Sequence, residues 1–179
     1  MSDAQTSRMT GGCQCGAVRY AFHAPIEKPS ICFCRMCQKA FGSYFAPLGS
    51  VPVDAFEVTR GTVSYFRSSD PVERGFCNNC GTPLTFHHVN GAKIDISLGS
   101  LDQPAAVPPT IAYGIEGRMP WFDKLMALPG TVTEDDGPRE FYDEISASSH
   151  QHPDHDTAVW PPTPGVTGRV PQRAGKVKR

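Results

Sequence analysis

The chain has 179 residues, of which 39% are hydrophobic and 20% charged, and its formal net charge is −1. This length favours one domain, and the near-neutral charge argues against a nucleic-acid binder that works through a general positive field. No stretch approaches the roughly 18 apolar residues of a membrane span. Residues 1–12 are polar and lack the apolar core of a secretory signal. We therefore expect a cytoplasmic protein with reduced cysteines, and neither a membrane nor a nucleic acid as its partner.

Alternating hydrophobic residues predict several β-strands in the first hundred residues. Residues 1–10 are small and polar, and we expect a flexible N-terminus there. Asn90-Gly91 predicts a hairpin turn, because both residues tolerate positive φ. One short helix is predicted at 35–41. The strands are expected at 18–22, 43–48, 62–66, 84–89 and 93–98, and their spacing indicates a compact, mostly antiparallel fold.

The second half of the chain is less regular. A strand is predicted at 110–115, and the aromatic segment 119–122 is expected to pack onto the body of the domain. Phe141, Tyr142 and Ile145 can form one face of a short helix. Beyond residue 145 Pro, Gly, Ser and charged residues dominate, so 11–145 is predicted to be the folded domain and 146–179 a Pro-rich flexible tail. The three histidines between residues 150 and 155 are interpreted as solvated side chains of this tail.

Seven cysteines are the most informative residues of the sequence. An odd number cannot pair off completely into disulfides, and seven is four plus three. A structural zinc site takes four protein ligands, whereas a catalytic zinc site keeps three and leaves one position open. The count therefore predicts one closed and one open zinc site, that is, two Zn²⁺ per chain. The cysteines are Cys13, Cys15, Cys32, Cys34, Cys37, Cys77 and Cys80.

Spacing brings some of these sulfurs together locally. Cys13 and Cys15 are two residues apart and can point to the same side of an extended strand. Cys77 and Cys80 are three apart across a turn, and Gly81 can supply the positive φ that such a turn needs. If the two pairs share one ion, the site ties the start of the domain to its middle and stabilises the fold.

Cys32, Cys34 and Cys37 combine both spacings and form a three-sulfur group. Three thiolates on Zn²⁺ leave a charge of −1, which favours a soft thiol as fourth ligand over the activation of water. Arg35 and Lys39 are the adjacent cations that could offset this charge or hold an anionic substrate, although both can equally be ordinary surface residues. Two alternatives stay open. A histidine (His23, His87 or His88) could close this site, and Cys32 and Cys34 could instead join Cys77 and Cys80.

Several motifs together resemble the glutathione-dependent formaldehyde-activating (GFA) or CENP-V-like family. The resemblance runs from about residue 11 to about residue 132. It implies a mainly β fold of packed antiparallel sheets, the Mss4-like or β-tent type. The motifs are Gly12-Cys13-Gln14-Cys15-Gly16, Cys32-x-Cys34-x-x-Cys37 followed by Phe41-Gly42-Ser43, Arg74-x-Phe76-Cys77-x-x-Cys80-Gly81-Thr82-x-Leu84, Leu98-Gly99-Ser100-Leu101-Asp102 and Pro120-Trp121-Phe122.

The resemblance also implies roles for the cysteines. Cys13, Cys15, Cys77 and Cys80 would hold a structural zinc, and Cys32, Cys34 and Cys37 a catalytic zinc. The implied activity is of the carbon–sulfur lyase type, in which glutathione and formaldehyde condense to S-hydroxymethylglutathione. The sequence departs from the family in two places. The residue between the first two cysteines of the three-cysteine group is often His in the family and is Phe33 here, and a His often precedes the Pro-Trp-Phe segment by several residues, where this chain reads Ile111-Ala112-Tyr113.

Two classes of function follow. In the first, the chain is an enzyme whose three-cysteine zinc activates a glutathione-like thiol for addition to a small aldehyde. In the second, both zinc sites are structural and the chain is a non-catalytic binding or assembly domain. A homodimer is compatible with either function, because edge strands can pair between copies.

Overall fold

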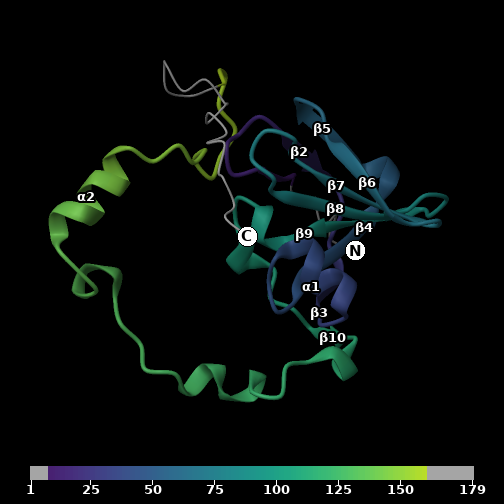
Figure 1. Ribbon diagram of the computed structural model, residues 1–179. Helices are drawn as coiled ribbons and strands as arrows, with labels where there is room; N and C mark the ends of the chain where they lie inside the picture. Colours follow the sequence, from purple (N-terminus) through teal and green to yellow (C-terminus); the bar gives the residue numbers. More distant parts are fainter. Residues whose placement is uncertain (1–7, 161–179) are drawn as a thin grey trace, which may run out of the picture.

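The computed structural model describes residues 8–160, and it is mainly β with two sheets. The larger sheet has seven strands in the order β10-β3-β4-β9-β8-β7-β6 (Figure 1). Its neighbouring strands are antiparallel except β10 and β3, which run parallel. Its strands are β3 (Glu27–Cys32), β4 (Ala46–Pro52), β6 (Ser64–Ser69), β7 (Val72–Phe76), β8 (Pro83–His88), β9 (Lys93–Ser97) and β10 (Ile111–Tyr113).

The smaller sheet has three antiparallel strands in the order β1-β2-β5. They are β1 (Met9–Gly12), β2 (Arg19–Phe22) and β5 (Phe56–Arg60). The structure has two α-helices, α1 (Arg35–Phe41) and α2 (Arg139–Ala147), within the described residues. Within residues 8–160, no helix has the length and apolar character needed to cross a lipid bilayer.

A shared hydrophobic core joins the two sheets. Tyr20 and Phe22 of the small sheet pack with Val51, Leu84 and Ile96 of the large sheet, and all five are essentially inaccessible to solvent. Burial of a large apolar side chain contributes about 1.5–3 kcal/mol, so this core supplies much of the folding free energy. The expected mainly β fold of packed sheets is thereby confirmed.

Several sequence predictions need correction at the level of single elements. Residues 9 and 10 belong to β1, which pairs with β2, so the N-terminus is ordered earlier than the expected boundary at residue 10. The hairpin at Asn90-Gly91 is present between β8 and β9, but neither residue has a positive φ. The turn closes instead with the Gly91 amide donating to the His88 carbonyl at 2.6 Å.

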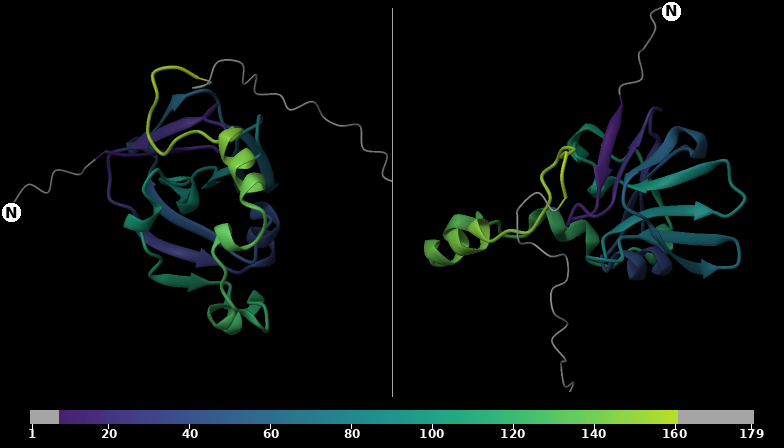
Figure 2. Two further views of the ribbon diagram at one scale, coloured as in Figure 1. Left: turned by 90° about the vertical axis from the view of Figure 1, so that its left-hand side faces the viewer. Right: turned by 90° about the horizontal axis from the view of Figure 1, so that it is seen from above.

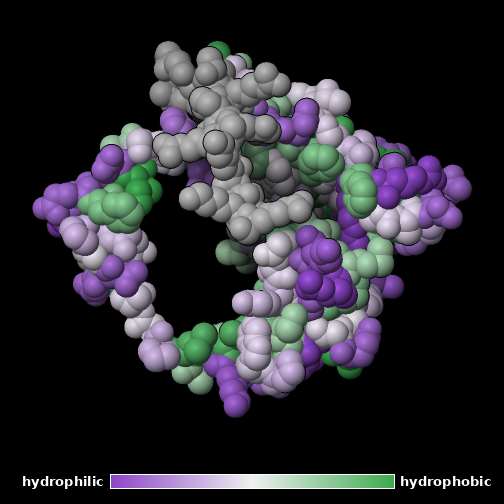
Figure 3. All heavy atoms as spheres, viewed as in Figure 1, coloured by the Kyte–Doolittle hydropathy of each residue, from purple (hydrophilic) through white to green (hydrophobic). Residues whose placement is uncertain are grey.

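Residues 118–150, here called the outer arm, leave the body and return to it. Trp121 and Phe122 at its start pack edge-on against Tyr44 and Phe33, as predicted for the aromatic segment. Beyond them the arm carries α2 in a wide arc, which stands clear of the sheets in two views (Figures 1 and 2). The space-filling view shows open space between arm and body (Figure 3). Met126, at 96% exposed, illustrates how little the arm contacts the rest of the chain.

Residues 151–160, here called the C-terminal strap, lie against the body, which differs from the expectation of a flexible tail. His152 is 8% exposed and packs on Gly16, where an added Cβ would lie 2.1 Å from its ring. Its amide donates to the Gln14 carbonyl at 2.7 Å, and the Trp160 indole donates to the Cys15 carbonyl at 2.5 Å. The histidine is therefore a packing residue. Residues 161–179 of the predicted tail lie outside the described residues.

Candidate metal centres

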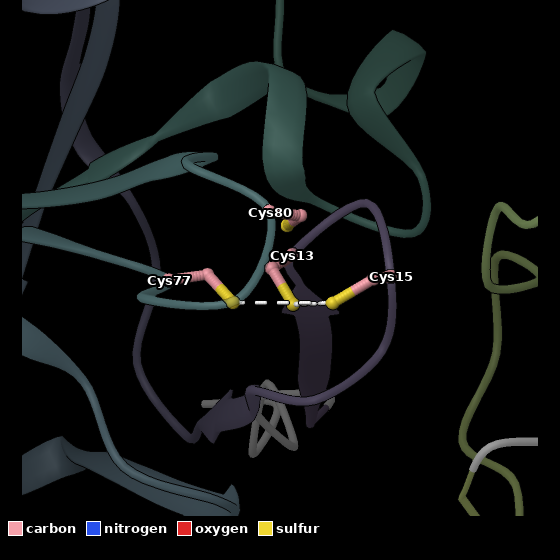
Figure 4. Close-up of side chains that lie close together, drawn as sticks. All are labelled: Cys13, Cys15, Cys77 and Cys80. Atoms are coloured by element: carbon pink, nitrogen blue, oxygen red, sulfur yellow. Dashed lines mark hydrogen bonds between the residues drawn. The ribbon is translucent and has the colours of Figure 1, made fainter. Parts of the chain in front are cut away.

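The turns β1–β2 and β7–β8 bring four cysteines together. Cys13 and Cys15 come from the first turn, Cys77 and Cys80 from the second, and all four sulfurs lie within 4.8 Å of one another (Figure 4). The Cys15 sulfur is 3.6 Å from that of Cys13 and 3.9 Å from that of Cys77. Tetrahedral zinc with bonds of about 2.3 Å separates its sulfurs by about 3.8 Å. The four residues therefore fit such an ion.

Backbone geometry holds these sulfurs in place. The Val18 amide donates to the Cys13 sulfur at 3.2 Å, and the Asn79 amide donates to the Cys77 sulfur at 3.4 Å. Gly81 has φ +80°, and its amide donates to the Cys77 carbonyl at 2.8 Å, so the predicted left-handed glycine is confirmed. Hydrogen bonds to sulfur stabilise the thiolate form that a metal requires.

The acidities of these thiols differ. The hydrogen bond with Cys80, together with burial, raises the pKa of Cys13. The same hydrogen bond, assisted by Thr82, lowers the pKa of Cys80 to about 3. Burial raises the pKa of Cys77. In the metal-free cluster, Cys80 therefore loses its proton more readily than Cys13 and Cys77. A zinc ion that binds all four sulfurs would displace the protons that the other thiols still carry.

A second, separate cluster holds the other three cysteines. Cys32 ends β3, Cys34 directly precedes α1 and Cys37 lies in its first turn, and their sulfurs lie within 4.8 Å of one another. Among the described residues, no histidine or carboxylate belongs to either cluster. The structure therefore separates Cys32 and Cys34 from Cys77 and Cys80.

The candidate histidines are engaged elsewhere or are exposed. His87 hydrogen-bonds to Glu73 and Gly91, and His88 packs edge-on against Phe86. His23 is exposed. The three sulfurs could hold a metal ion, and the described residues supply no fourth His, Cys, Asp or Glu ligand to it.

The three-cysteine site is held by contacts from the segment that follows β10. Gly114 has φ +60°, and an added Cβ would lie 2.7 Å from the Cys34 nitrogen, so only glycine permits this approach. The buried Gln38 amide donates to the carbonyls of Phe33 and Gly117 at 2.8 and 2.9 Å. These contacts fix the backbone on both sides of Cys34.

The ionisation of the three thiols is also uneven. Burial raises the pKa of Cys32 to about 12. Burial opposes ionisation of Cys34 too, but hydrogen bonds from the Cys37 amide and the neighbouring thiols outweigh it and lower the pKa of Cys34. Burial raises the pKa of Cys37, although a hydrogen bond from Arg74 acts in the opposite direction. Cys34 is accordingly the first of the three to ionise.

The cation that contacts this site is Arg74 of β7, a residue whose place in the sequence gives no sign of the contact. Its Nη2 lies 3.6 Å from the Cys37 sulfur. Arg35, the sequence neighbour expected to offset the charge, donates instead to the Gln38 side chain at 3.2 Å. Lys39 is exposed. Strand pairing across the large sheet, which sequence spacing does not reveal, places Arg74 here.

Comparisons with known proteins place the chain in a family. The model of the family described as "Glutathione-dependent formaldehyde-activating enzyme" (GFA) matches residues 8–115, which contain both clusters. An uncharacterized lyase of Schizosaccharomyces pombe is 35% identical over 83 residues, which are 45% of this chain and 58% of the relative. A putative glutathione-dependent formaldehyde-activating enzyme of Phaeosphaeria nodorum is 31% identical over 80 residues, 44% of this chain and 42% of the relative.

The chain spans about half the length of these curated relatives. A crystal structure of a Rhodobacter sphaeroides protein, a structural genomics target, is similar at a TM-score of 0.48 and 20% identity, over 58% of this chain and 99% of that chain. The family match covers more than half of the sequence and includes every cysteine. The chain therefore belongs to the glutathione-dependent formaldehyde-activating enzyme family.

Proposed function

We propose that this protein is a zinc-dependent enzyme of the carbon–sulfur lyase type, in which a thiol such as glutathione adds to formaldehyde or a related small aldehyde. The observation that carries the proposal is the group of three converging sulfurs, with no fourth ligand from the described residues. Family membership and the printed names of the relatives support the class of reaction. The thiol, the aldehyde and the metal are parts of the proposal.

Cys32, Cys34 and Cys37 would hold the catalytic zinc. When bound, the ion supplies a thiophilic Lewis acid that keeps the cosubstrate sulfur deprotonated and nucleophilic. The thiol would lose its proton to solvent, and its sulfur would add to the carbonyl carbon, so that a carbon–sulfur bond forms while the carbonyl π pair moves to oxygen. The oxygen would take a proton from solvent, which gives the hemithioacetal (with formaldehyde, the S-hydroxymethyl thiol).

The surrounding chain contributes positioning. In the sequence, Phe33 stands between Cys32 and Cys34. The rings of Phe45 and Phe122 pack edge-on against the Phe33 ring, with centroids 6.0 and 4.7 Å from its centroid. Gln38 and Gly114 fix the backbone beside Cys34, as described above. A donor set fixed in this way requires little rearrangement when metal and thiol bind, and such preorganisation accelerates reactions between bound partners.

Cys13, Cys15, Cys77 and Cys80 would hold a second, structural zinc. They join β1 to the β7–β8 turn, so the ion would connect the two sheets. Binding free energies of about 10–16 kcal/mol for structural zinc rival the whole stability of a domain. We therefore expect the fold to depend on this site.

Metal stoichiometry and thiol binding test the proposal. Cys37→Ser should lower the zinc content from two to one per chain and leave the protein folded, whereas Cys77→Ser should unfold it. In the cobalt-substituted protein, glutathione should change the sulfur-to-cobalt charge-transfer bands. If both ions are bound and no thiol alters these bands, the enzyme proposal is refuted. The alternative, a non-catalytic binding or assembly domain with two closed metal sites, would then hold.

A further inference from the structure

Arg74 is a buried cation to which the described part of the chain offers no carboxylate partner. Its side chain comes from β7, in the interior of the large sheet, and the residue is 9% exposed. Among the described side chains, no carboxylate oxygen forms an ion pair with it. Arginine stays protonated even when buried, and a buried charge is costly unless an opposite charge lies nearby. The surroundings of Arg74 must therefore supply a negative charge.

The contacts of Arg74 identify that charge. Nη2 lies 3.6 Å from the Cys37 sulfur, and Nε donates to the Ser68 hydroxyl at 3.2 Å. The guanidinium carbon lies 4.9 Å from the centre of the Phe86 ring, and Nη1 is buried with no hydrogen-bond partner among the described residues. The sulfur is the one contact among these that can carry a full negative charge. With a metal bound, all three sulfurs would be thiolates, and Cys37 would then supply the counter-charge of Arg74.

Charge counting shows what this contact changes. Zn²⁺ with three thiolates has a charge of −1, and a fourth thiolate would bring the site to −2. When the +1 charge of the Arg74 guanidinium is included, the net charge is 0 with three thiolates and −1 with four. Arg74 therefore favours an anionic fourth ligand and has little effect on a neutral one.

The other cations near the site lack this contact. Arg118 has its guanidinium carbon 5.3 Å from the centre of the Phe33 ring and pairs with the exposed Asp123. Arg35 donates to Gln38, as noted above. Among the described residues, Arg74 is the cation that hydrogen-bonds to a sulfur of this site.

We propose that Arg74 is a positioning residue that selects a thiolate as the fourth ligand of the three-cysteine site. This inference rests on the proposed function, because it assumes a metal with an open position. Arg74 acts through the charge of the site and through Cys37. Its removal should weaken thiolate binding specifically.

The test measures ligand binding to the cobalt-substituted protein by visible absorption, at one fixed pH. 2-Mercaptoethanol is the anionic probe, because it carries no charge besides that of its sulfur, and imidazole is the neutral probe. Arg74→Met should raise the Kd of 2-mercaptoethanol on the order of 10- to 100-fold and change that of imidazole little. Arg74→Lys, which keeps the charge, should recover much of the loss.

Arg67→Met is the matched control. Arg67 lies on the neighbouring β6 and donates to the Asp70 carbonyl at 2.7 Å, so this variant should bind both probes as the wild type does. Arg74→Gln is the second neutral variant if Arg74→Met does not fold. Equal losses for both probes would indicate a merely structural role, and unchanged binding of 2-mercaptoethanol would also overturn the inference. A wild type that binds no thiol would instead refute the proposed function.

Discussion

Asp102→Ala removes one partner of a buried ion pair. Asp102 accepts two hydrogen bonds from the Arg19 guanidinium, at 2.8 and 2.5 Å, and the two side chains are 8% and 3% exposed. Arg19 also donates to Asp156 of the C-terminal strap at 2.9 Å, and Asp156 is 40% exposed. The guanidinium thus has one buried and one half-exposed partner.

The expected loss of unfolding free energy in each variant follows from this difference in burial between Asp102 and Asp156. Removal of one member of a buried pair costs about 3–5 kcal/mol, because the other charge is left without compensation. Asp156 would still compensate part of the Arg19 charge, so we expect about 3 kcal/mol for Asp102→Ala. An exposed pair contributes about 0–1 kcal/mol, which is the expectation for Asp156→Ala.

Urea unfolding of the zinc-loaded protein, followed by circular dichroism at constant zinc concentration, measures both variants. With a slope of about 2 kcal/mol/M, Asp102→Ala should lower the midpoint by about 1.5 M and Asp156→Ala by less than about 0.5 M. The double variant should lose more than the sum of the two, because Arg19 then has neither partner. Equal losses for the two single variants would refute the reasoning.

Three further predictions concern pH, the three-cysteine site and the strap. Burial alone would raise the pKa of Asp102, but hydrogen bonds and charge from Arg19 outweigh it and lower that pKa below its ordinary 3.8. Stability from this group is therefore present above pH 3.8 and lost as pH falls through the folded pKa. Asp102→Asn should remove that part of the acid dependence in unfolding curves recorded against pH. Gly114→Ala, with its Cβ 2.7 Å from the Cys34 nitrogen, should lower the zinc affinity of the three-cysteine site in a chelator competition, while Gly99→Ala, with nothing within 4 Å, should not. Trp160→Phe removes the indole hydrogen bond to the Cys15 carbonyl, in the loop between β1 and β2. It should speed hydrogen exchange of the amides in that loop and lower the stability by about 1 kcal/mol. Unchanged exchange would mean that the strap does not restrain the loop.

Sequence patterns predicted the strands whose hydrophobic and polar residues alternate clearly. The predicted bounds of β2, β8 and β9 are close to those of the structure, and so are the bounds of helix α1. Strands β1, β3, β5 and β7 were missed, because β1 is rich in glycine, β3 contains Pro29, and β7 contains Arg74 and Gly75. These strands form through pairing with their neighbours, and local propensity gives little sign of them.

The candidate sites could be predicted where their residues lie close together along the chain. The short spacings within each cysteine group are visible in the sequence, and the family resemblance joined the two pairs of the four-cysteine site. The contact of Arg74 with Cys37 depends on how the sheet folds over α1, so no spacing reveals it. The strap was missed because its composition is polar, and its contacts use a few residues, such as Asp156 and Trp160, with specific partners.

The four-cysteine site joins residues that the ribosome makes at different times. At about 5–20 residues per second, Cys80 is translated several seconds after Cys13. During that interval the first cysteine pair is on the nascent chain without its partners, where oxidants and competing metals can reach it. The strap is made later still, and it closes over a loop whose metal site can already be complete. If the four-cysteine site holds the proposed structural zinc, zinc supply during synthesis should determine how much of the chain reaches the native state.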